Sequence, residues 1–425
     1  MLIKNATIVT MDSQRKIIKN GDIYIQGNKI VKIGKNIDVK DNEIINAKGM
    51  VALPGFIKTH THSSMTLLRG YADDLPLMKW LKEYIWPLET LIKPEDCYIG
   101  SKLACLEMIK AGITTFSDMY IHMSQVAKAV EDSGMRGVLS YVINDIMPEN
   151  LAGITATKRF LSEVKKSDRI IPIIGPHSPY ACSKETLQKA KELADNLKTL
   201  IHTHVSETKE EVEESKKKLG LRPIEYLNSI GLLDSNLEIA HCVWVNDNEI
   251  KMLAKNNVKI CHCSVSNMKL ASGIAPLKFM LDNNLIVSLG SDGPCSNNRL
   301  DMIQEMKFSS LLQKVSLKDP TAIPAEKALE MATINGAKAL RLDDKLGSIE
   351  VGKLADIILI DFKKPHLTPM HNVFSHLVYA AQASDVDTVI CNGKILMRNR
   401  KVLTLDEKEV MERAELAKEG LLGRK

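Results

Sequence analysis

The feature that most constrains this fold is the alternation of short apolar runs with helical stretches through the middle of the chain. Each run has the length of a buried strand, and the longer segments between the runs are typical of helices. This order predicts an α/β fold, and eight strands over roughly 300 residues favour a (β/α)8 TIM barrel. A doubly wound open sheet is the main alternative. The eight runs are 50–59, 113–118, 137–143, 170–175, 200–205, 237–241, 258–262 and 285–292.

Both ends of the chain differ from this middle part and indicate short β structure. Residues 2–10 form a predicted strand, and a hairpin signal follows around Gly27. Near the other end, 386–390 and 394–397 flank Asn392-Gly393, which is a strong hairpin turn. Neither end offers enough strands for a stable core of its own. We therefore expect the two ends to fold together.

This reasoning predicts three parts of the chain. Residues 1–50 and 350–405 form a small composite β-sandwich domain, and residues 51–349 form the barrel. Residues 406–425 form a charged helical tail.

Composition and charge exclude several classes of protein. The sequence is 44% hydrophobic and 26% charged, which is ordinary for a globular protein with a large core. The net charge of +5 comes from mixed signs along the chain, which argues against nucleic-acid and membrane partners. The N-terminus lacks a signal-peptide pattern and no apolar run is long enough to span a membrane, so we predict a cytoplasmic protein. Eight cysteines are too sparse for a disulfide scaffold.

Metal-competent side chains gather at the ends of the predicted strands. His60 and His62 follow the first run, and the alternation of side chains points both rings the same way. Because the carboxyl ends of barrel strands form one face, the groups at the other strand ends should converge with them. His202 points the same way as His204 but one layer deeper, where a core role is expected. The other strand-end groups are His177, His204, His241, His262 and Asp292.

We predict a single-metal site built from His60, His62, His204 and Asp292. Three neutral imidazoles and one carboxylate suit Zn²⁺, with Fe²⁺ or Mn²⁺ as alternatives. A metal of this kind lowers the pKa of a bound water to about 7, which makes hydroxide available at neutral pH.

Hydroxide attack also needs a proton carrier, and Glu207 lies at the mouth of the strand that carries His204. Proton transfer by such a group contributes about 10²–10⁴-fold to the rate. The alternative for Glu207 is a carboxylate stabilised by a helix N-terminus. His241 and Asp292 are predicted to contact the same water, and the alternative for His241 is a core histidine bonded to the backbone.

Several motifs resemble known enzymes. The segments 54–62, 204–207 and 291–293, together with His241, are similar to the amidohydrolase superfamily. The longer segments 86–89, 175–178, 265–273 and 291–298 resemble the 5-methylthioadenosine/S-adenosylhomocysteine deaminases within it.

The resemblance implies that His60, His62, His204 and Asp292 bind the metal. It also implies that Glu89 binds the ribose hydroxyls, His177 contacts the substrate and Glu207 carries protons beside the base. Without the motif, Glu89 would be a surface helix residue, and 296–298 would be no more than a turn. The fourth strand ends in Gly175-Pro176-His177 and lacks the lysine that bridges two metals in some relatives, so a mononuclear site is expected.

The resemblance implies hydrolytic deamination of adenosine-type nucleosides to inosine analogues and ammonia, through attack at purine C6. Candidate substrates are 5'-deoxyadenosine, 5'-methylthioadenosine, S-adenosylhomocysteine and adenosine, which places the enzyme in salvage of S-adenosylmethionine by-products. Some relatives hold the homocysteine carboxylate with arginines near strand 3, but Arg136 precedes that strand and should lie at the opposite end of the barrel. Lys158 and Arg159 are possible substitutes that no motif aligns. Uncharged 5' groups are therefore favoured.

Two other functions stay open at this stage. One is another mononuclear hydrolase that acts on guanine, cytosine or a chloro-triazine. The other is a barrel without catalysis that binds or assembles. We expect a homo-oligomer, either a dimer or a tetramer.

Overall fold

The computed structural model describes residues 1–425 except 165–166 and 168. Its centre is a sheet of eight parallel strands in chain order, each strand hydrogen-bonded to the next. The first and last strands meet where the Thr59 N–H donates to the Leu289 carbonyl at 3.0 Å and the Ser291 N–H donates to the His60 carbonyl at 3.1 Å. The predicted (β/α)8 barrel is confirmed. Its strands are β6 (Phe56–Lys58), β7 (Ile113–Tyr120), β8 (Arg136–Ile143), β9 (Ile170–Pro176), β10 (Ile201–Val205), β11 (Leu237–His241), β12 (Lys259–His262) and β13 (Ile286–Leu289).

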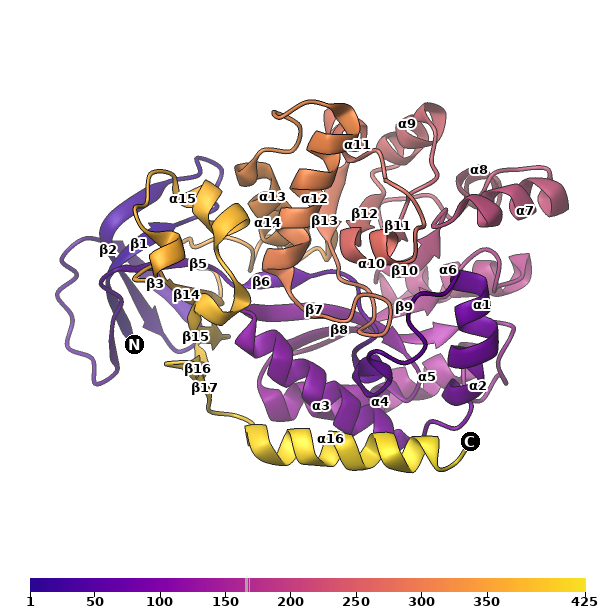
Figure 1. Cartoon of the computed structure of the whole chain (residues 1–425), viewed down its shortest axis with the longest axis horizontal. Coiled ribbons are helices and arrows are strands. Elements are labelled where there is room, and N and C mark those ends of the chain that lie inside the picture. The colour runs from indigo at the N-terminus through magenta and orange to yellow at the C-terminus, as the bar shows by residue number, and fades with distance from the viewer. Residues whose placement is uncertain (165–166, 168) are drawn as a thin grey trace.

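Helices cover the outside of the barrel (Figure 1). They are α3 (Pro94–Lys110), α4 (Met123–Ser133), α5 (Ile154–Glu163), α6 (Lys184–Leu197), α7 (Lys209–Leu219), α8 (Pro223–Ser229), α9 (Asp247–Lys255), α10 (Ser264–Lys269), α11 (Leu277–Asp282), α12 (Met302–Leu317), α13 (Ala325–Ala332) and α14 (Ile334–Ala339). Between β6 and α3 the chain forms four short turns of helix at the carboxyl ends of the strands. These are η1 (Ser63–Leu68), α1 (Leu77–Trp80), η2 (Leu81–Ile85) and α2 (Trp86–Glu89).

The two chain ends form one further sheet of nine strands, in which indigo and yellow segments lie together in Figure 1. Its core is mostly isoleucine from both ends, including Ile3, Ile23, Ile357 and Ile390. The predicted β domain built from both ends is therefore confirmed. Its strands are β1 (Leu2–Val9), β2 (Ile17–Gln26), β3 (Lys29–Gly34), β4 (Ile44–Asn46), β5 (Met50–Pro54), β14 (Ile357–Asp361), β15 (Val386–Cys391), β16 (Lys394–Arg398) and β17 (Lys401–Val402).

The apolar run at 50–59 is not one barrel strand, and here the structure corrects the sequence prediction. Its first half is β5, which pairs with β1 and β14 in the nine-stranded sheet, and only β6 belongs to the barrel. Gly55 lies between the two strands, where a Cβ atom would lie 2.3 Å from the Thr114 side chain. The missing side chain lets the backbone pass closely from one sheet to the other. The predicted domain limit at residue 50 thus falls inside β5, and the limits stay a prediction.

The charged tail forms the helix α16 (Glu407–Leu422), which lies along α3 at the outside of the barrel (Figure 1). Lys110 of α3 forms an ion pair with Glu407 at 2.8 Å. The remaining short helices are η3 (Pro365–Leu367), α15 (Val373–Ser375), η4 (His376–Ala380) and η5 (Ala383–Asp385). Across the part of the chain that the structure describes, no helix is long and apolar enough to cross a membrane.

Candidate active site

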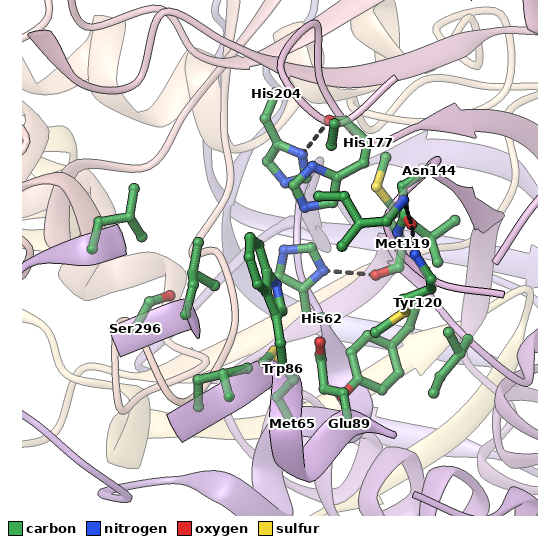
Figure 2. Close-up of a pocket in the computed structure, with 18 of the residues that line it drawn as sticks. His62, Met65, Trp86, Glu89, Met119, Tyr120, Asn144, His177, His204 and Ser296 are labelled. Carbon is green, nitrogen blue, oxygen red and sulfur yellow. Dashed lines mark hydrogen bonds between the residues drawn. The ribbon is translucent and has the colours of Figure 1, made fainter. Parts of the chain in front are cut away.

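A pocket opens at the carboxyl ends of the barrel strands, and imidazole rings crowd its floor (Figure 2). His60 and His62 follow β6, His204 lies in β10, and His241 ends β11. The ring centroids of His60 lie 4.8 Å from those of both His62 and His204. Asp292, three residues after β13, completes the floor. These five of the strand-end groups that the sequence singled out therefore converge, as barrel topology predicts.

Hydrogen bonds fix which nitrogen of each ring carries the proton. The Nδ1 of His62 lies 2.6 Å from the Met119 carbonyl, and the Nδ1 of His204 lies 2.7 Å from the His177 carbonyl (Figure 2). A carbonyl only accepts, so each Nδ1 must carry the hydrogen. When these rings are neutral, both Nε2 atoms present a lone pair to the centre of the pocket, which is the form that binds a metal ion. Burial would lower the pKa of His62, but the facing Asp292 carboxylate raises it to about 9, so a metal ion here would replace a proton on that Nε2.

Asp292 faces these nitrogens with one carboxylate oxygen. Its Oδ1 lies 3.3 Å from the Nε2 of His60 and 3.2 Å from the Nε2 of His62. Its Oδ2 accepts hydrogen bonds of 2.7 Å from the hydroxyls of Ser266 and Ser296. Burial alone would raise the pKa of Asp292, but the two imidazoles hold it well below its usual value. The carboxylate is thus held ionised and aimed at the ring nitrogens.

The donor atoms are close enough to share one ion. One metal-competent group joins His60, His62 and Asp292, a second joins His60, His204 and His241, and within each group the ligand atoms lie within 4.8 Å of one another. The Nε2 of His60 is buried without a hydrogen-bond partner. Burial also lowers the pKa of His60 and of His204 well below the usual value, which keeps both rings neutral. An orphaned nitrogen, lone pairs and a facing carboxylate fit a divalent cation.

Glu207 and His241 lie beside this group. Glu207 is buried, burial raises its pKa, and its Oε2 lies 3.7 Å from the Nε2 of His241. The Nδ1 of His241 lies 2.9 Å from the amide oxygen of Asn267. The polar partners of His241 are thus side chains, not the backbone carbonyl that the alternative interpretation expected. A carboxyl group with a raised pKa is suited to carry a proton near neutral pH.

The helix-terminus role considered for Glu207 belongs instead to Glu211. The Oε1 and Oε2 atoms of Glu211 accept the backbone N–H groups of Ser206 and Glu207 at 2.8 and 2.7 Å. Burial raises the pKa of Glu211 to about 7. Glu211 therefore fixes the backbone at Glu207 and leaves the Glu207 side chain free of that task. The charged pattern of α7 hides this role, so sequence reasoning missed it.

Glu89 lies across the pocket from His204, with its carboxylate pointing toward the His62 ring in Figure 2. It is buried, and burial raises its pKa to about 7, so it is no surface helix residue. His177 also lines the pocket, and burial lowers its pKa to about 3, which keeps the ring neutral. Tyr120 lies beside Glu89.

Three predicted details have other outcomes. His262 ends β12 but does not line the pocket, and neither ring nitrogen has a hydrogen-bond partner. The segment 296–298 is more than a turn, because Ser296 holds Asp292 and the Asn297 amide donates to the Ser291 carbonyl at 2.7 Å. His202 contacts His60 directly, which the expected core role did not include.

The walls of the pocket are largely apolar. They come from the turns before α3, from the end of β7 and from β8 and the loop after it. Among the described residues that line the pocket there is no lysine or arginine. Arg136 is buried at the amino end of β8 and pairs with Asp356, as its place before the strand predicted. Lys158 and Arg159 lie on α5 and do not line the pocket. The apolar wall residues include Trp80, Ile85, Trp86, Ile121, Val142, Ile146 and Met147.

The fold and the site together define a class: a TIM-barrel hydrolase whose His/Asp group can hold a divalent metal ion at the carboxyl ends of the strands. Comparison with known proteins gives the family. A model of the amidohydrolase family matches residues 51–396, and the chain belongs to that family.

The relatives agree with the resemblance that the motifs carry. A 5-methylthioadenosine/S-adenosylhomocysteine deaminase of Pelotomaculum thermopropionicum is 47% identical over 98% of this chain and 97% of its own. A 5'-deoxyadenosine deaminase of Methanosarcina acetivorans is 47% identical over 100% of this chain and 99% of its own. The crystal structure of an adenosine deaminase from Xanthomonas campestris with bound zinc matches with a TM-score of 0.96 at 31% identity, covering 99% of this chain and 98% of that one.

Proposed function

We propose that this protein is a metal-dependent aminohydrolase that deaminates adenosine-type nucleosides altered at the 5' position. The observation that carries the proposal is a buried Glu207 beside His241 and the His/Asp group, at the floor of a pocket with apolar walls. Deaminases of such nucleosides that are 47% identical over nearly the whole chain support it. The products are the inosine analogue and ammonia.

The proposed metal ligands are His60, His62, His204 and Asp292. Zn²⁺ is the proposed ion, with Fe²⁺ or Mn²⁺ as alternatives, because neutral imidazoles and one carboxylate suit it and a similar structure was solved with zinc. When bound, such an ion supplies an activated water at neutral pH. The predicted homo-oligomer and the cytoplasmic location stay predictions.

The proton steps belong to the chain's own residues. Glu207 takes a proton from the attacking water and delivers it to N1 of the purine. The water oxygen bonds to C6 while the C6–N1 double bond becomes a single bond, so that C6 becomes tetrahedral. His241, whose Nε2 faces Glu207, and Asp292, which Ser266 and Ser296 hold in place, orient the oxygen that attacks. When the tetrahedral carbon collapses, the proton that remains on the C6 oxygen passes to the amino nitrogen. The C6–N bond breaks, the C6 carbonyl forms, and ammonia leaves. Such proton transfer contributes about 10²–10⁴-fold.

The nucleoside is held by the other polar groups of the pocket. Glu89 accepts hydrogen bonds from the ribose hydroxyls, and His177, kept neutral by burial, contacts the substrate. The 5' substituent meets apolar walls without a cation among the described lining residues. A carboxylate placed there would lose its hydration without a partner, which is costly. We therefore propose that 5'-deoxyadenosine and 5'-methylthioadenosine are preferred over S-adenosylhomocysteine.

A substrate panel tests the proposal on protein of known metal content. Ammonia release is measured for the three nucleosides above, for adenosine, and for free adenine, guanine and cytosine, and chloride release is measured for a chloro-triazine. We expect kcat/KM to be highest for the uncharged 5'-modified nucleosides. Turnover of free bases or of a chloro-triazine with inactive nucleosides would replace the proposal with the alternative hydrolases. Zinc-loaded protein that acts on none of these compounds would instead support a binding protein.

A further inference from the structure

A chain of buried polar groups runs beneath His60, away from the pocket. The Nδ1 of His60 lies 2.7 Å from the Nε2 of His202, and the Nδ1 of His202 lies 3.0 Å from the Oε2 of Glu238. His202 is 1% exposed and Glu238 is fully buried. The two residues are register partners on the adjacent parallel strands β10 and β11, so the barrel itself sets their spacing.

A metal ion bound to the Nε2 of His60 would fix the direction of both hydrogen bonds, because the hydrogen of that ring must then lie on Nδ1. The Nε2 of His202 accepts this hydrogen, so the hydrogen of His202 lies on its own Nδ1 and Glu238 accepts it. This arrangement leaves the Nε2 of His60 without a proton, and that atom is the buried nitrogen without a partner that faces Asp292.

His60 differs in this respect from the other two predicted histidine ligands. The Nδ1 atoms of His62 and His204 donate to neutral backbone carbonyls. The Nδ1 of His60 is instead linked through His202 to the carboxylate of Glu238. A charged acceptor in this position increases the basicity of a histidine ligand and holds the plane of its ring.

A purely structural role explains these residues poorly. A buried carboxylate loses its hydration, and apolar residues of similar volume would fill the barrel interior at lower free-energy cost. The Oε1 of Glu238 has no hydrogen-bond partner, so its burial is not fully compensated within the described structure. The carboxylate and His202 are therefore better explained by what they do to His60.

We propose that His202 and Glu238 are positioning residues for the metal centre: they fix the tautomer and orientation of His60 and strengthen it as a ligand. This inference rests on the metal site of the proposed function but not on its substrate. It assigns a role to His202, which the sequence placed in the core, and to Glu238, which no motif singled out.

The test compares Glu238→Gln with the wild type and with Glu249→Gln as a matched control. The first change keeps the shape and an acceptor oxygen but removes the charge. Glu249 on α9 is also fully buried, has an Oε1 without a partner and pairs with Arg222 away from the site. Zinc affinity is measured by equilibrium competition with a chromogenic chelator, and the thermal midpoint of each protein is measured without metal.

We expect Glu238→Gln to weaken zinc binding by about 10–100-fold while the metal-free midpoint does not fall. Glu249→Gln should leave the zinc affinity unchanged. A zinc affinity of Glu238→Gln within twofold of the wild type would overturn the inference, as would a wild type that binds no zinc. Wild-type protein that binds zinc tightly but deaminates no nucleoside would overturn only the proposed function.

A second variant keeps the inference testable if Glu238→Gln does not fold. In His202→Gln the amide oxygen can still accept the Nδ1–H of His60, but the link to the carboxylate is lost. We expect the visible absorption bands of the Co²⁺-loaded variant to shift and zinc affinity to fall at least tenfold. A wild-type spectrum together with wild-type affinity would contradict a role for the carboxylate beyond simple hydrogen bonding.

Discussion

The sharpest test of the catalytic proposal is the substitution Glu207→Gln. The glutamine side chain has the same size and fits the same buried place, but it cannot take up a proton. Burial raises the pKa of Glu207, and its Oε2 lies 3.7 Å from the Nε2 of His241 at the floor of the pocket. A group in this position can exchange a proton with both the water and the purine ring.

The magnitude follows from the role. A positioned proton carrier contributes about 10²–10⁴-fold, which corresponds to about 2.7–5.4 kcal/mol in the activation free energy. We therefore expect kcat of Glu207→Gln to fall by that factor, because every turnover moves a proton through this carboxyl group. Zinc content should stay at the wild-type level, since Glu207 is not among the proposed ligands.

The assay is steady-state deamination of 5'-deoxyadenosine, followed by ammonia release, with zinc measured on the same samples. The control is Glu210→Gln, an exposed residue of α7 that leaves both activity and zinc unchanged. A kcat of Glu207→Gln within tenfold of the wild type would refute the proton-carrier role. Loss of zinc from this variant alone would show instead that Glu207 helps to hold the metal.

Two further predictions concern binding and folding. Glu89→Gln should raise KM for nucleosides by about 10–100-fold, since a hydrogen bond to a charged group contributes about 1.5–3 kcal/mol. Because burial raises the pKa of Glu89 to about 7, the wild-type KM should fall as the pH rises through 7 and the carboxylate forms. A flat KM profile from pH 6 to 8 would contradict this role of Glu89. Gly55→Ala should lower the free energy of unfolding in urea by about 1–3 kcal/mol, because the new Cβ would lie 2.3 Å from the Thr114 side chain. The control is Gly220→Ala, which measures the cost of backbone strain alone, because φ is +73° at Gly220 and a Cβ there would have nothing within 4 Å.

The convergence of the site could be predicted because it depends on topology alone. Once the runs are assigned to parallel strands, His60, His204 and Asp292 must come to one end of the barrel whatever the packing of the helices. The division at Gly55 could not be predicted, because β5 and β6 form one continuous apolar run and only the partners of each strand separate them. Periodicity reports which face is buried and not which sheet buries it.

The supporting residues escaped the sequence for a different reason. Ser266 and Asn267 lie in the segment 265–273 that carries the resemblance, but nothing in their spacing points to Asp292 or His241 as their partners. Glu238 lies in no such segment, and its partner His202 is far away in the chain although it lies on the adjacent strand. His202 did have the right spacing, two residues before His204, and was assigned to the core. The buried position of His202 was predicted correctly. Burial alone, however, does not distinguish a side chain that only packs in the core from one that hydrogen-bonds to a metal ligand such as His60.

The charges of the pocket carry the argument for substrate choice further than the motifs do. Glu89, Glu207 and Asp292 bring three carboxyl groups to one pocket, and no lysine or arginine stands among its described lining residues. A substrate with its own carboxylate would add negative charge beside these groups and lose water against apolar walls. A 5'-methyl or 5'-methylthio group meets the same walls without either cost. The selectivity of this enzyme should therefore depend on the lack of a lysine or arginine among the described residues that line the pocket as much as on any contact that the pocket makes.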